Sequence, residues 1–489
     1  MPSERRGAIR AGAGLLMLWA LGARAEPWLA PGNEAIRHDI QILADAGVLR
    51  GPVTSWPLSW PDIARDVLGA SDDQLDEQAA AALLRVRRHA RRASAPGFTG
   101  LGLAVSATNA PSELRGFGTW PRDVGELGIK AGWMNSRVAV NASAAFVVDP
   151  EDDKAWRADG SYVGVNAGNF MISAGYMERW WGPGWDGSLI LSTNARPIPS
   201  ITLERNYTDP FETKLLSWLG HWRASIAVGR MESHDIAVPD VRFLAARFNF
   251  RPRSWLEFAL TRSAQFCGGD RECGWSQLGN LLIGRDNRSD DLSAEDEPGN
   301  QMAGYDLRLS SPWRRLPAAV YMQWIGEDEA GGLPSKFMGL AGVETWFTAA
   351  GGGMRVRAEF TDTTCSFTRE APDFNCGYRN TLYPQAYTYR GRVIGHSMDN
   401  DSRMYALGGT WVSARGDSIG LSARRVELNR DGGPHLITAV PRRYEDVELR
   451  YMGTFRIGTL HAGLATATGQ VPAGWDSHTR AFVTWQQGF

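Results

Sequence analysis

The sequence predicts an all-β transmembrane barrel of the bacterial outer membrane, with about 18 antiparallel strands and a small N-terminal α-helical bundle in the periplasm. Three observations predict this fold. They are an export signal, a change of the hydrophobic period from 3.6 to 2 near residue 96, and strand links that alternate between short and long. They divide the chain into a signal peptide (1–25), a three-helix periplasmic domain (26–95) and the barrel (96–489).

The first 25 residues have the order of a secretory signal peptide. Arginines precede an apolar run at residues 11–22, and an A-x-A site follows, so cleavage is expected after Ala25. The apolar run of about 12 residues is shorter than the roughly 20 that a spanning helix needs. Arg5-Arg6 fits a twin-arginine signal less well, because a barrel must cross the inner membrane unfolded.

Residues 26–95 carry the patterns of three short helices. Asn33 can cap the first helix and Ser59 the second, each followed by apolar residues three or four apart. Residues 75–92 form the third, and the arginines near its end complement the helix dipole.

From residue 98 onward the side chains alternate between two faces. Residues 354–361 alternate Met, Val, Ala and Phe with Arg, Arg, Glu and Thr, and residues 138–148 and 305–310 also alternate. The apolar face would be the core of a soluble sandwich, whereas in a barrel it faces lipid and the polar face lines the lumen. Charged residues recur on the second face along the whole chain, which favours the barrel.

The links between strands provide an independent check. Short links are predicted near residues 217–220, 251–254, 311–315, 349–352, 414–416 and 453. Long links are predicted at residues 232–240, 267–300, 327–335, 362–402 and 427–443. Their regular alternation gives about eighteen strands, with sixteen as the alternative, and leaves both termini in the periplasm.

The composition and the last residues agree with this architecture. The 55 glycines and 20 tryptophans in 489 residues suit many turns and an interfacial aromatic girdle. A net charge of -2 argues against a nucleic-acid partner. The terminal Phe489, preceded by alternating residues that include Trp485, is typical of the signal recognised by the barrel assembly machinery, although Gln487 departs from it.

The four cysteines form two local pairs, Cys267 with Cys273 and Cys365 with Cys376. An exported protein meets an oxidising periplasm, so two loop disulfides are expected. The alternative, free thiols, is less favoured. No histidines lie at zinc-ligand spacing, and no metal is predicted.

Several stretches together resemble the capsule assembly Wzi family. They include residues 36–49 (IRHDIQILADAGVL), 175–199 (GYMERWWGPGWDGSLILSTNARPIP), 325–344 (IGEDEAGGLPSKFMGLAGVE) and 389–405 (YRGRVIGHSMDNDSRMY). The resemblance covers essentially the whole mature chain. It implies an eighteen-stranded outer-membrane barrel with a periplasmic helical bundle. It also implies a lectin, not an enzyme, that helps attach capsular polysaccharide to the cell surface. The partners predicted from the whole sequence are surface polysaccharide, outer-membrane lipid and the barrel assembly machinery, and no cofactor is predicted.

The first candidate site is a tryptophan-rich segment that the strand count places in an extracellular loop. Indole rings stack on sugar rings, and carboxylate, amide and guanidinium groups bind hydroxyls or uronate carboxylates. The predicted polysaccharide-binding residues here are Trp180, Trp181, Trp185, Asp186, Asn194 and Arg196. The alternative is that these tryptophans pack the loop into the barrel mouth as a plug, or belong to the aromatic girdle.

Two acidic loop tips extend the candidate site. Asp328 and Glu329 belong to one, and Asp399 and Arg403 to the other. They could bind sugar hydroxyls or calcium, but the chain has no EF-hand pattern, and such tips are more often simply solvated.

Two alternative functions remain open at this stage. The first is a porin or saccharide channel, which needs an open lumen. The second is a barrel hydrolase built on His396 and Ser397, but adjacent strand residues point to opposite faces and no nucleophile elbow is visible.

Overall fold

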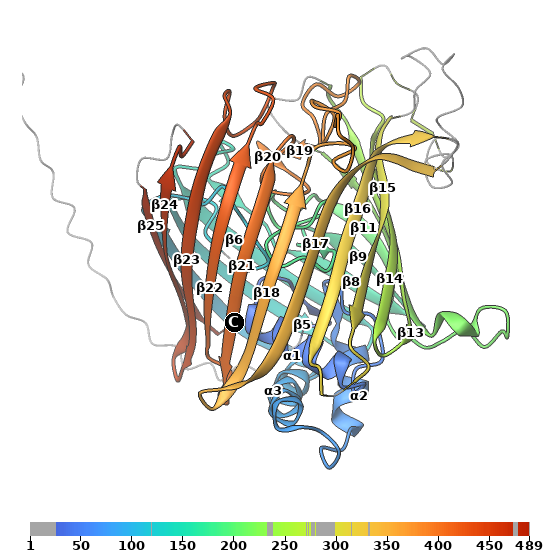
Figure 1. Cartoon of the computed structure of the whole chain (residues 1–489). Helices are drawn as coiled ribbons and strands as arrows, with labels where there is room; N and C mark the ends of the chain where they lie inside the picture. The colour runs from blue at the N-terminus through green and yellow to red at the C-terminus, as the bar shows by residue number, and fades with distance from the viewer. Residues whose placement is uncertain are drawn as a thin grey trace, which may run out of the picture.

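The computed structural model describes residues 26–118, 120–231, 238–269, 271, 273, 274, 279, 299–313, 315–330, 333–472 and 478–488. The predicted signal peptide and Phe489 lie outside these residues. The described chain forms one closed antiparallel barrel with three helices at one end (Figure 1). We call that end the helix end and the opposite end the outer end.

The barrel wall consists of eighteen strands within the described residues, because β7 and β8 both pair with β6 as one interrupted strand. The prediction of about eighteen strands is confirmed, and the alternative of sixteen is wrong. The strands are β4 (Gly97–Thr108), β5 (Gly125–Met134), β6 (Val138–Val148), β7 (Trp156–Arg157), β8 (Tyr162–Ala167), β9 (Phe170–Gly175), β11 (Ser200–Arg205), β12 (His221–Arg230), β13 (Arg242–Arg253), β14 (Leu256–Phe266), β15 (Gly299–Ser310), β16 (Ala318–Ala330), β17 (Leu333–Ala349), β18 (Gly352–Asp362), β21 (Arg403–Ser413), β22 (Ser418–Leu428), β23 (Arg442–Phe455), β24 (Gly458–Gly469) and β25 (Thr479–Gln487). The barrel closes where β25 pairs with β4.

The alternation of side chains places charge inside the barrel and apolar groups outside. In β18, Arg355, Arg357 and Glu359 are buried in the lumen. On the outer face, Leu407 of β21 and Leu421 of β22 are 64% and 52% exposed. An apolar exterior around a closed ladder, in which the backbone groups of the wall are paired, is the arrangement of a membrane-spanning barrel.

The three helices are α1 (Glu34–Asp45), α2 (Trp60–Gly69) and α3 (Glu77–Ala93). Their N-caps form as the sequence predicts, because the side chains of Asn33 and Ser59 accept bonds from backbone N–H groups in the first helical turn. Two-stranded pairs involving β1 (Trp28–Leu29), β2 (Ser55–Trp56) and β3 (Leu58–Ser59) connect them to the barrel interior. None of the helices in the described part of the chain is long and apolar enough to cross a membrane.

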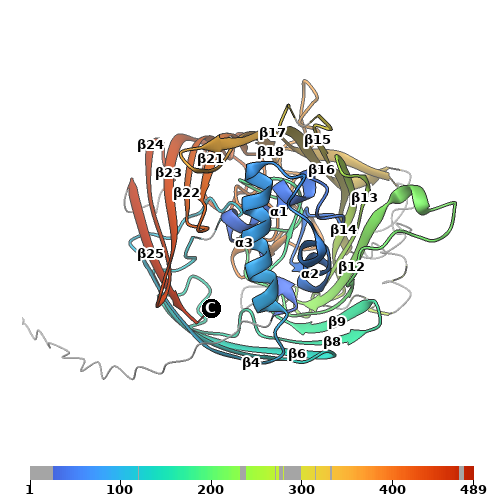
Figure 2. The same cartoon turned by 90° about the horizontal axis from the view of Figure 1, so that it is seen from below.

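The helices fill the mouth of the barrel at the helix end, as the view from below shows (Figure 2). Their apolar core includes Phe117 and Trp180 from barrel connectors. Ion pairs tie α1 to the wall: Asp45 with Arg308 at 2.6 Å, and Glu34 with Arg450 at 2.9 Å. The helical segment and the barrel therefore share one core.

One predicted link is wrong. Residues 327–335 were expected to form an outer loop, but β16 and β17 continue through most of this range, with Asp328 opposite Ser335 and Glu329 opposite Pro334. The antiparallel pairing of the wall simply extends beyond the barrel rim as a two-stranded ribbon. The side chains of Asp328 and Glu329 lie outside the described part of the structure.

Candidate functional site

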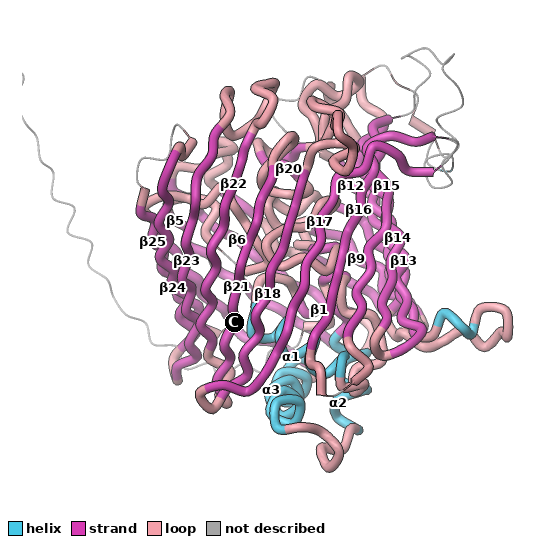
Figure 3. The backbone as a smooth tube through the Cα atoms, in the orientation of Figure 1, coloured by secondary structure: helices cyan, strands magenta, loops and turns pink. Residues whose placement is uncertain are grey.

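The predicted tryptophan site lies inside the barrel and not in an exposed loop. Residues 176–199 connect β9 to β11 and fold into the lumen, where loop segments pass within the ring of strands (Figure 3). β10 (Trp180–Trp181) pairs there with β2, which is part of the N-terminal segment. We call residues 176–199 the plug.

The three tryptophans of the plug have almost no exposed surface. Trp180, Trp181 and Trp185 are 0%, 2% and 1% exposed. The prediction of surface stacking platforms is therefore wrong, and the alternative of a packed plug describes the segment. The physical reason is the width of an eighteen-stranded barrel, because side chains of the wall alone cannot fill it and large rings from connecting segments do.

The indole N–H groups of Trp180 and Trp185 donate to protein acceptors. Trp185 donates to Glu344 through Nε1 at 3.0 Å, and Trp180 donates to the carbonyl of Gly184 at 3.1 Å. The guanidinium of Arg37, from α1, lies 4.2 Å from the centre of the Trp185 ring. A cation held against an aromatic face is stabilising in a desolvated site, and here it links α1 to the plug.

Asp186 anchors the plug to the barrel wall. Its carboxylate accepts from Arg357 of β18 at 3.1 Å and from Arg424 of β22 at 2.9 Å. The backbone N–H groups of Trp185 and Asp186 donate to Glu359 at 2.8 and 3.1 Å. Burial alone would raise the pKa of Asp186, but the two guanidinium groups outweigh it, and the pKa lies well below its usual range. The ionised carboxylate is thus part of the fold.

Asn194 and Arg196 also bind within the protein. Asn194 donates to the carbonyl of Val393 at 2.9 Å, and Arg196 forms a two-point pair with Asp159 at 2.9 and 2.8 Å. These bonds join connectors to one another, and we do not assign the two residues to a polysaccharide.

Connectors close the barrel at its outer end. We call the described residues of 109–124, 149–161, 363–402 and 429–441 the outer cap. Ion pairs cross between these segments, including Arg157 with Asp123 and Arg392 with Glu151, whose atoms lie 2.9 and 2.8 Å apart. Sequence reasoning missed these arginines because their partners are distant in the chain and no local motif marks them.

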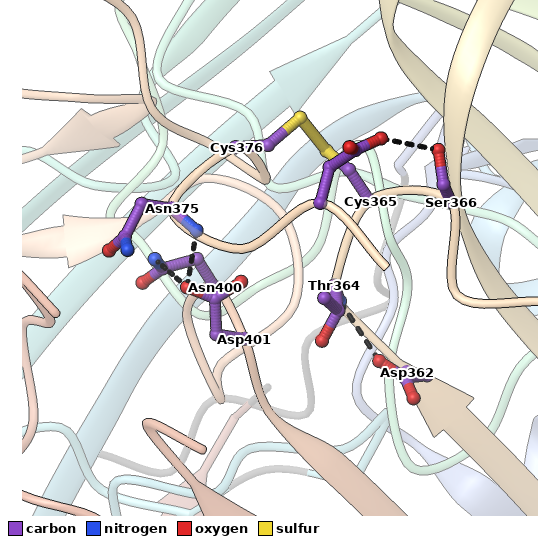
Figure 4. Close-up of a disulfide and its surroundings, with 9 residues drawn as sticks. Asp362, Thr364, Cys365, Ser366, Asn375, Cys376, Asn400 and Asp401 are labelled. Carbon is purple, nitrogen blue, oxygen red and sulfur yellow. Dashed lines mark hydrogen bonds between the residues drawn. A yellow bond between two sulfur atoms is a disulfide. The ribbon is translucent and has the colours of Figure 1, made fainter. Parts of the chain in front are cut away.

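The disulfide between Cys365 and Cys376 braces the longest described connector of the outer cap (Figure 4). Around it, the N–H of Thr364 donates to Asp362 at 3.0 Å and the N–H of Asn375 donates to Asp401 at 2.8 Å. Burial, together with nearby carboxylates, raises the pKa of Asp401 to about 6. The second predicted pair, Cys267 with Cys273, is also bonded.

The second acidic tip is not a solvated loop end. Asp399 is 0% exposed and accepts from Arg379, while Arg403 donates to Asp362 at 2.8 Å. The Asp399 part of the predicted surface site is wrong, because ion pairing under the cap buries this carboxylate. Within the described residues, no group of three or more His, Cys, Asp or Glu side chains could hold a metal ion.

His396 and Ser397 do not form a hydrolase pair. The Ser397 hydroxyl accepts from the backbone N–H of Arg115 at 3.1 Å. His396 is fully buried with its Nε2 against Gly187, where an added Cβ would lie only 1.9 Å from it. Burial lowers the pKa of His396 to about 4. This geometry leaves no accessible nucleophile and base.

Comparisons with known proteins agree with this architecture. The family described as Capsule assembly protein Wzi matches residues 103–485. An uncharacterized 55.8 kDa protein of the cps region of Klebsiella pneumoniae is 32% identical over 337 residues, which are 67% of this chain and 64% of that relative. The chain therefore spans about two thirds of the length of the curated relative it matches.

A solved structure extends the likeness to the fold. Wzi of Escherichia coli superposes with a TM-score of 0.82 at 24% identity, over 94% of this chain and 99% of that chain. That protein is described as an outer membrane protein involved in group 1 capsule assembly and as a carbohydrate-binding β-barrel.

Proposed function

We propose that this chain, which belongs to the capsule assembly protein Wzi family, is an outer-membrane lectin. It binds capsular or other surface polysaccharide and helps attach that polymer to the cell surface. The carbohydrate binding of the Escherichia coli Wzi barrel supports this assignment, as does the shared fold.

The observation that carries the proposal is the filled lumen. The plug and the three helices occupy the barrel interior, and ion pairs fasten them to the wall from both sides. A porin needs a continuous path for solutes, so this packing disfavours the channel alternative. The protein then binds its ligand at one of its ends and not in an open channel. The outer cap is at the end that faces the capsule.

Arginines of the outer cap and its rim supply the polar groups for binding. Four of them are paired with a carboxylate on one side, while 13% to 28% of the side chain stays exposed: Arg379, Arg390, Arg403 and Arg430. Guanidinium groups held in this way can donate to sugar hydroxyls or to acidic substituents of a polymer. Each contact is shallow, so the affinity comes from repeats of the polymer meeting several arginines.

The proposal is tested with the purified, detergent-solubilised protein. Its binding to immobilised capsular polysaccharide from the producing bacterium is measured. The wild type should bind, and Arg379→Gln with Arg430→Gln should weaken binding several-fold without abolishing it. The matched control is Arg456→Gln, in the exposed turn between β23 and β24 at the helix end. A folded barrel is heat-modifiable, which means that its mobility on a gel changes when the sample is boiled. If the folded wild type does not bind, the lectin assignment is wrong.

The same preparation tests the alternatives. In planar bilayers the wild type should show no sustained conductance, because the plug fills the lumen. Steady single-channel currents from the folded wild type would favour a porin. We propose that the protein is not an enzyme, which release of monosaccharide from the bound polymer would contradict.

A further inference from the structure

A cavity of about 390 Å³ lies beside the plug, between its base and the inner face of β24, β25, β4 and β5. These strands lie on the side of the barrel away from α2 (Figure 2). The inner side of the outer cap supplies part of its lining, including Trp120 and Arg122, but the four arginines of the proposed surface site do not line it. We call it the side chamber.

One wall of the side chamber is a row of polar side chains. His461, Thr484, Ser106 and Glu126 are direct register neighbours across the four adjacent strands. Directly opposed residues of antiparallel strands have Cβ atoms about 5 Å apart, so the row is a continuous polar strip on the luminal face. Gln486 extends it toward the helix end.

These groups have hydrogen-bonding capacity that the protein does not use. In the described residues, the side chains of His461, Thr484, Ser106, Glu126 and Gln486 make no hydrogen bond or ion pair with other groups. The charged groups of the lumen around the plug are, in contrast, extensively paired. Polar groups that are left open toward a cavity are available to water or to a ligand.

Small residues create the space in front of this row. Ala104, Gly128 and Ala145 line the side chamber next to the polar strip. A Cβ added at Gly128 would meet nothing closer than 3.7 Å, which is ordinary van der Waals contact. Gly128 is therefore not required by close packing, and its hydrogen atom in place of a side chain keeps the chamber open.

The rest of the lining includes aromatic and charged side chains. Trp28, Trp120 and Tyr162 belong to it, together with the ion pair of Arg122 and Glu178 at 2.7 Å. Rings beside hydroxyl-binding side chains are the combination that recognises saccharides, because the C–H face of a sugar packs on the ring and its hydroxyls bond to the polar strip.

The side chamber opens toward the helix end. There the paired side chains of Glu26 and Lys130 are 34% and 24% exposed. Toward the outer cap, the side chain of Arg157 is 5% exposed and Trp120 is 4% exposed, so the lining is packed more tightly there. A ligand would enter beside α3 and end below the cap.

We propose that the side chamber binds a short, uncharged saccharide segment that enters from the helix end. The choice of a saccharide rests on the proposed function, whereas the position of the site rests on the polar row and the cavity. The volume falls in the range of about 300 to 1,000 Å³ typical of small-ligand sites. The lining has four cationic side chains (Arg115, Arg122, Lys130, Arg157) and four anionic ones (Glu26, Glu126, Asp159, Glu178), a balance that suits an uncharged ligand, and the polar strip disfavours a lipid chain.

Titration of the full-length protein in detergent with neutral oligosaccharides tests this site. The probes are maltotriose, cellotriose and neutral fragments from partial hydrolysis of the producing strain's capsule, followed by saturation-transfer NMR and calorimetry. At least one probe should bind the wild type. Gly128→Met should fill the chamber and weaken that binding about tenfold, and Glu126→Gln should weaken it less.

The matched control is Ala107→Met, on the exposed outer face of β4. It should leave binding unchanged, and heat-modifiable mobility should show that each variant is folded. Binding of the intact polymer through the outer cap should be the same in Gly128→Met and the wild type.

Three outcomes overturn the proposal. If a probe binds Gly128→Met as tightly as the wild type, the ligand lies elsewhere. If the polymer binds but none of the oligosaccharides does, the side chamber proposal is wrong while the lectin function stands. If neither binds the folded protein, both are wrong.

Discussion

Replacing Asp186 by asparagine should loosen the plug from the barrel wall. The carboxylate is the point at which the plug meets two guanidinium groups, Arg357 and Arg424, at 3.1 and 2.9 Å, and it is 3% exposed. Asparagine keeps one acceptor oxygen, but its amide N–H group points toward the N–H groups of a guanidinium, so two donors face each other. The substitution removes the charge without removing much volume, so the effect reports on the ion pairs.

The expected loss follows from what remains around each arginine. Breaking a buried pair costs about 3 to 5 kcal/mol when a charge is left uncompensated. Arg424 keeps Asp446 and Glu448, at 2.9 and 2.7 Å, whereas among the described carboxylates Glu34, at 3.9 Å, is the one ion-pair partner that Arg357 keeps. One of the two cations therefore loses its near partner, and we expect about 3 kcal/mol, the lower end of the range.

The free energy of unfolding, from urea titration in lipid vesicles followed by tryptophan fluorescence, measures this loss. The matched control is Glu427→Gln, which removes the partner of Arg443, a side chain that is 60% exposed. An exposed pair contributes about 0 to 1 kcal/mol. If Asp186→Asn and Glu427→Gln destabilise the protein equally, the plug is not held by buried ion pairs, and the reasoning is refuted.

Three further predictions concern the outer cap and the membrane surface. Burial raises the pKa of Asp401 from 3.8 to about 6, so the protonated side chain stabilises the folded cap at low pH. This stabilisation is lost as the pH rises from 3.8 through 6. Asp401→Asn should remove that slope, worth up to about 3 kcal/mol, in unfolding midpoints measured between pH 4 and pH 7.5. Cys365→Ser with Cys376→Ser should cost about 3 kcal/mol of unfolding free energy by loop-closure entropy, and protease resistance of residues 363–402 should fall; unchanged cleavage would contradict this. Residues 206–220 extend sideways from the wall near the helix end (Figure 1), and Leu215 and Trp218 are 80% and 60% exposed. We therefore expect this loop to contact the membrane surface. A fluorophore at position 215 should be quenched by spin-labelled lipids, whereas one at Glu370 of the outer cap should not.

The parts of the fold set by local chemistry could be predicted from the sequence. The caps at Asn33 and Ser59 act within three residues of themselves, and strand alternation at residues 354–361 repeats every two residues. The disulfide partners are 6 and 11 residues apart, and both pairs are bonded. The wall, its strand number and the helices follow from such short-range rules.

The position of the plug depends on partners that no local pattern reveals. Trp181 pairs with Ser55, Trp185 bonds to Glu344 and Asp186 to Arg424, each more than a hundred residues away. A connector with three tryptophans has the same local sequence whether it turns outward to solvent or inward to the lumen. The strand count correctly places the connector at the outer end of β9, but it cannot give the direction of the turn.

The charged side chains that line the lumen indicate that the connector turns inward. An open channel would leave the inward charges of β18 in water, where single carboxylates and guanidinium groups need no partner. Here Arg355, Arg357 and Glu359 are at most 4% exposed, and each meets a group from the plug, the helices or a neighbouring strand. Burying a charge without a partner is costly, so a wall carrying these residues requires a complementary interior. The polar row of the side chamber departs from this rule in the described lumen, because its five side chains have neither a partner nor a covering segment. A binding site would leave the same pattern, and the Gly128→Met variant separates a ligand from bound water as its cause.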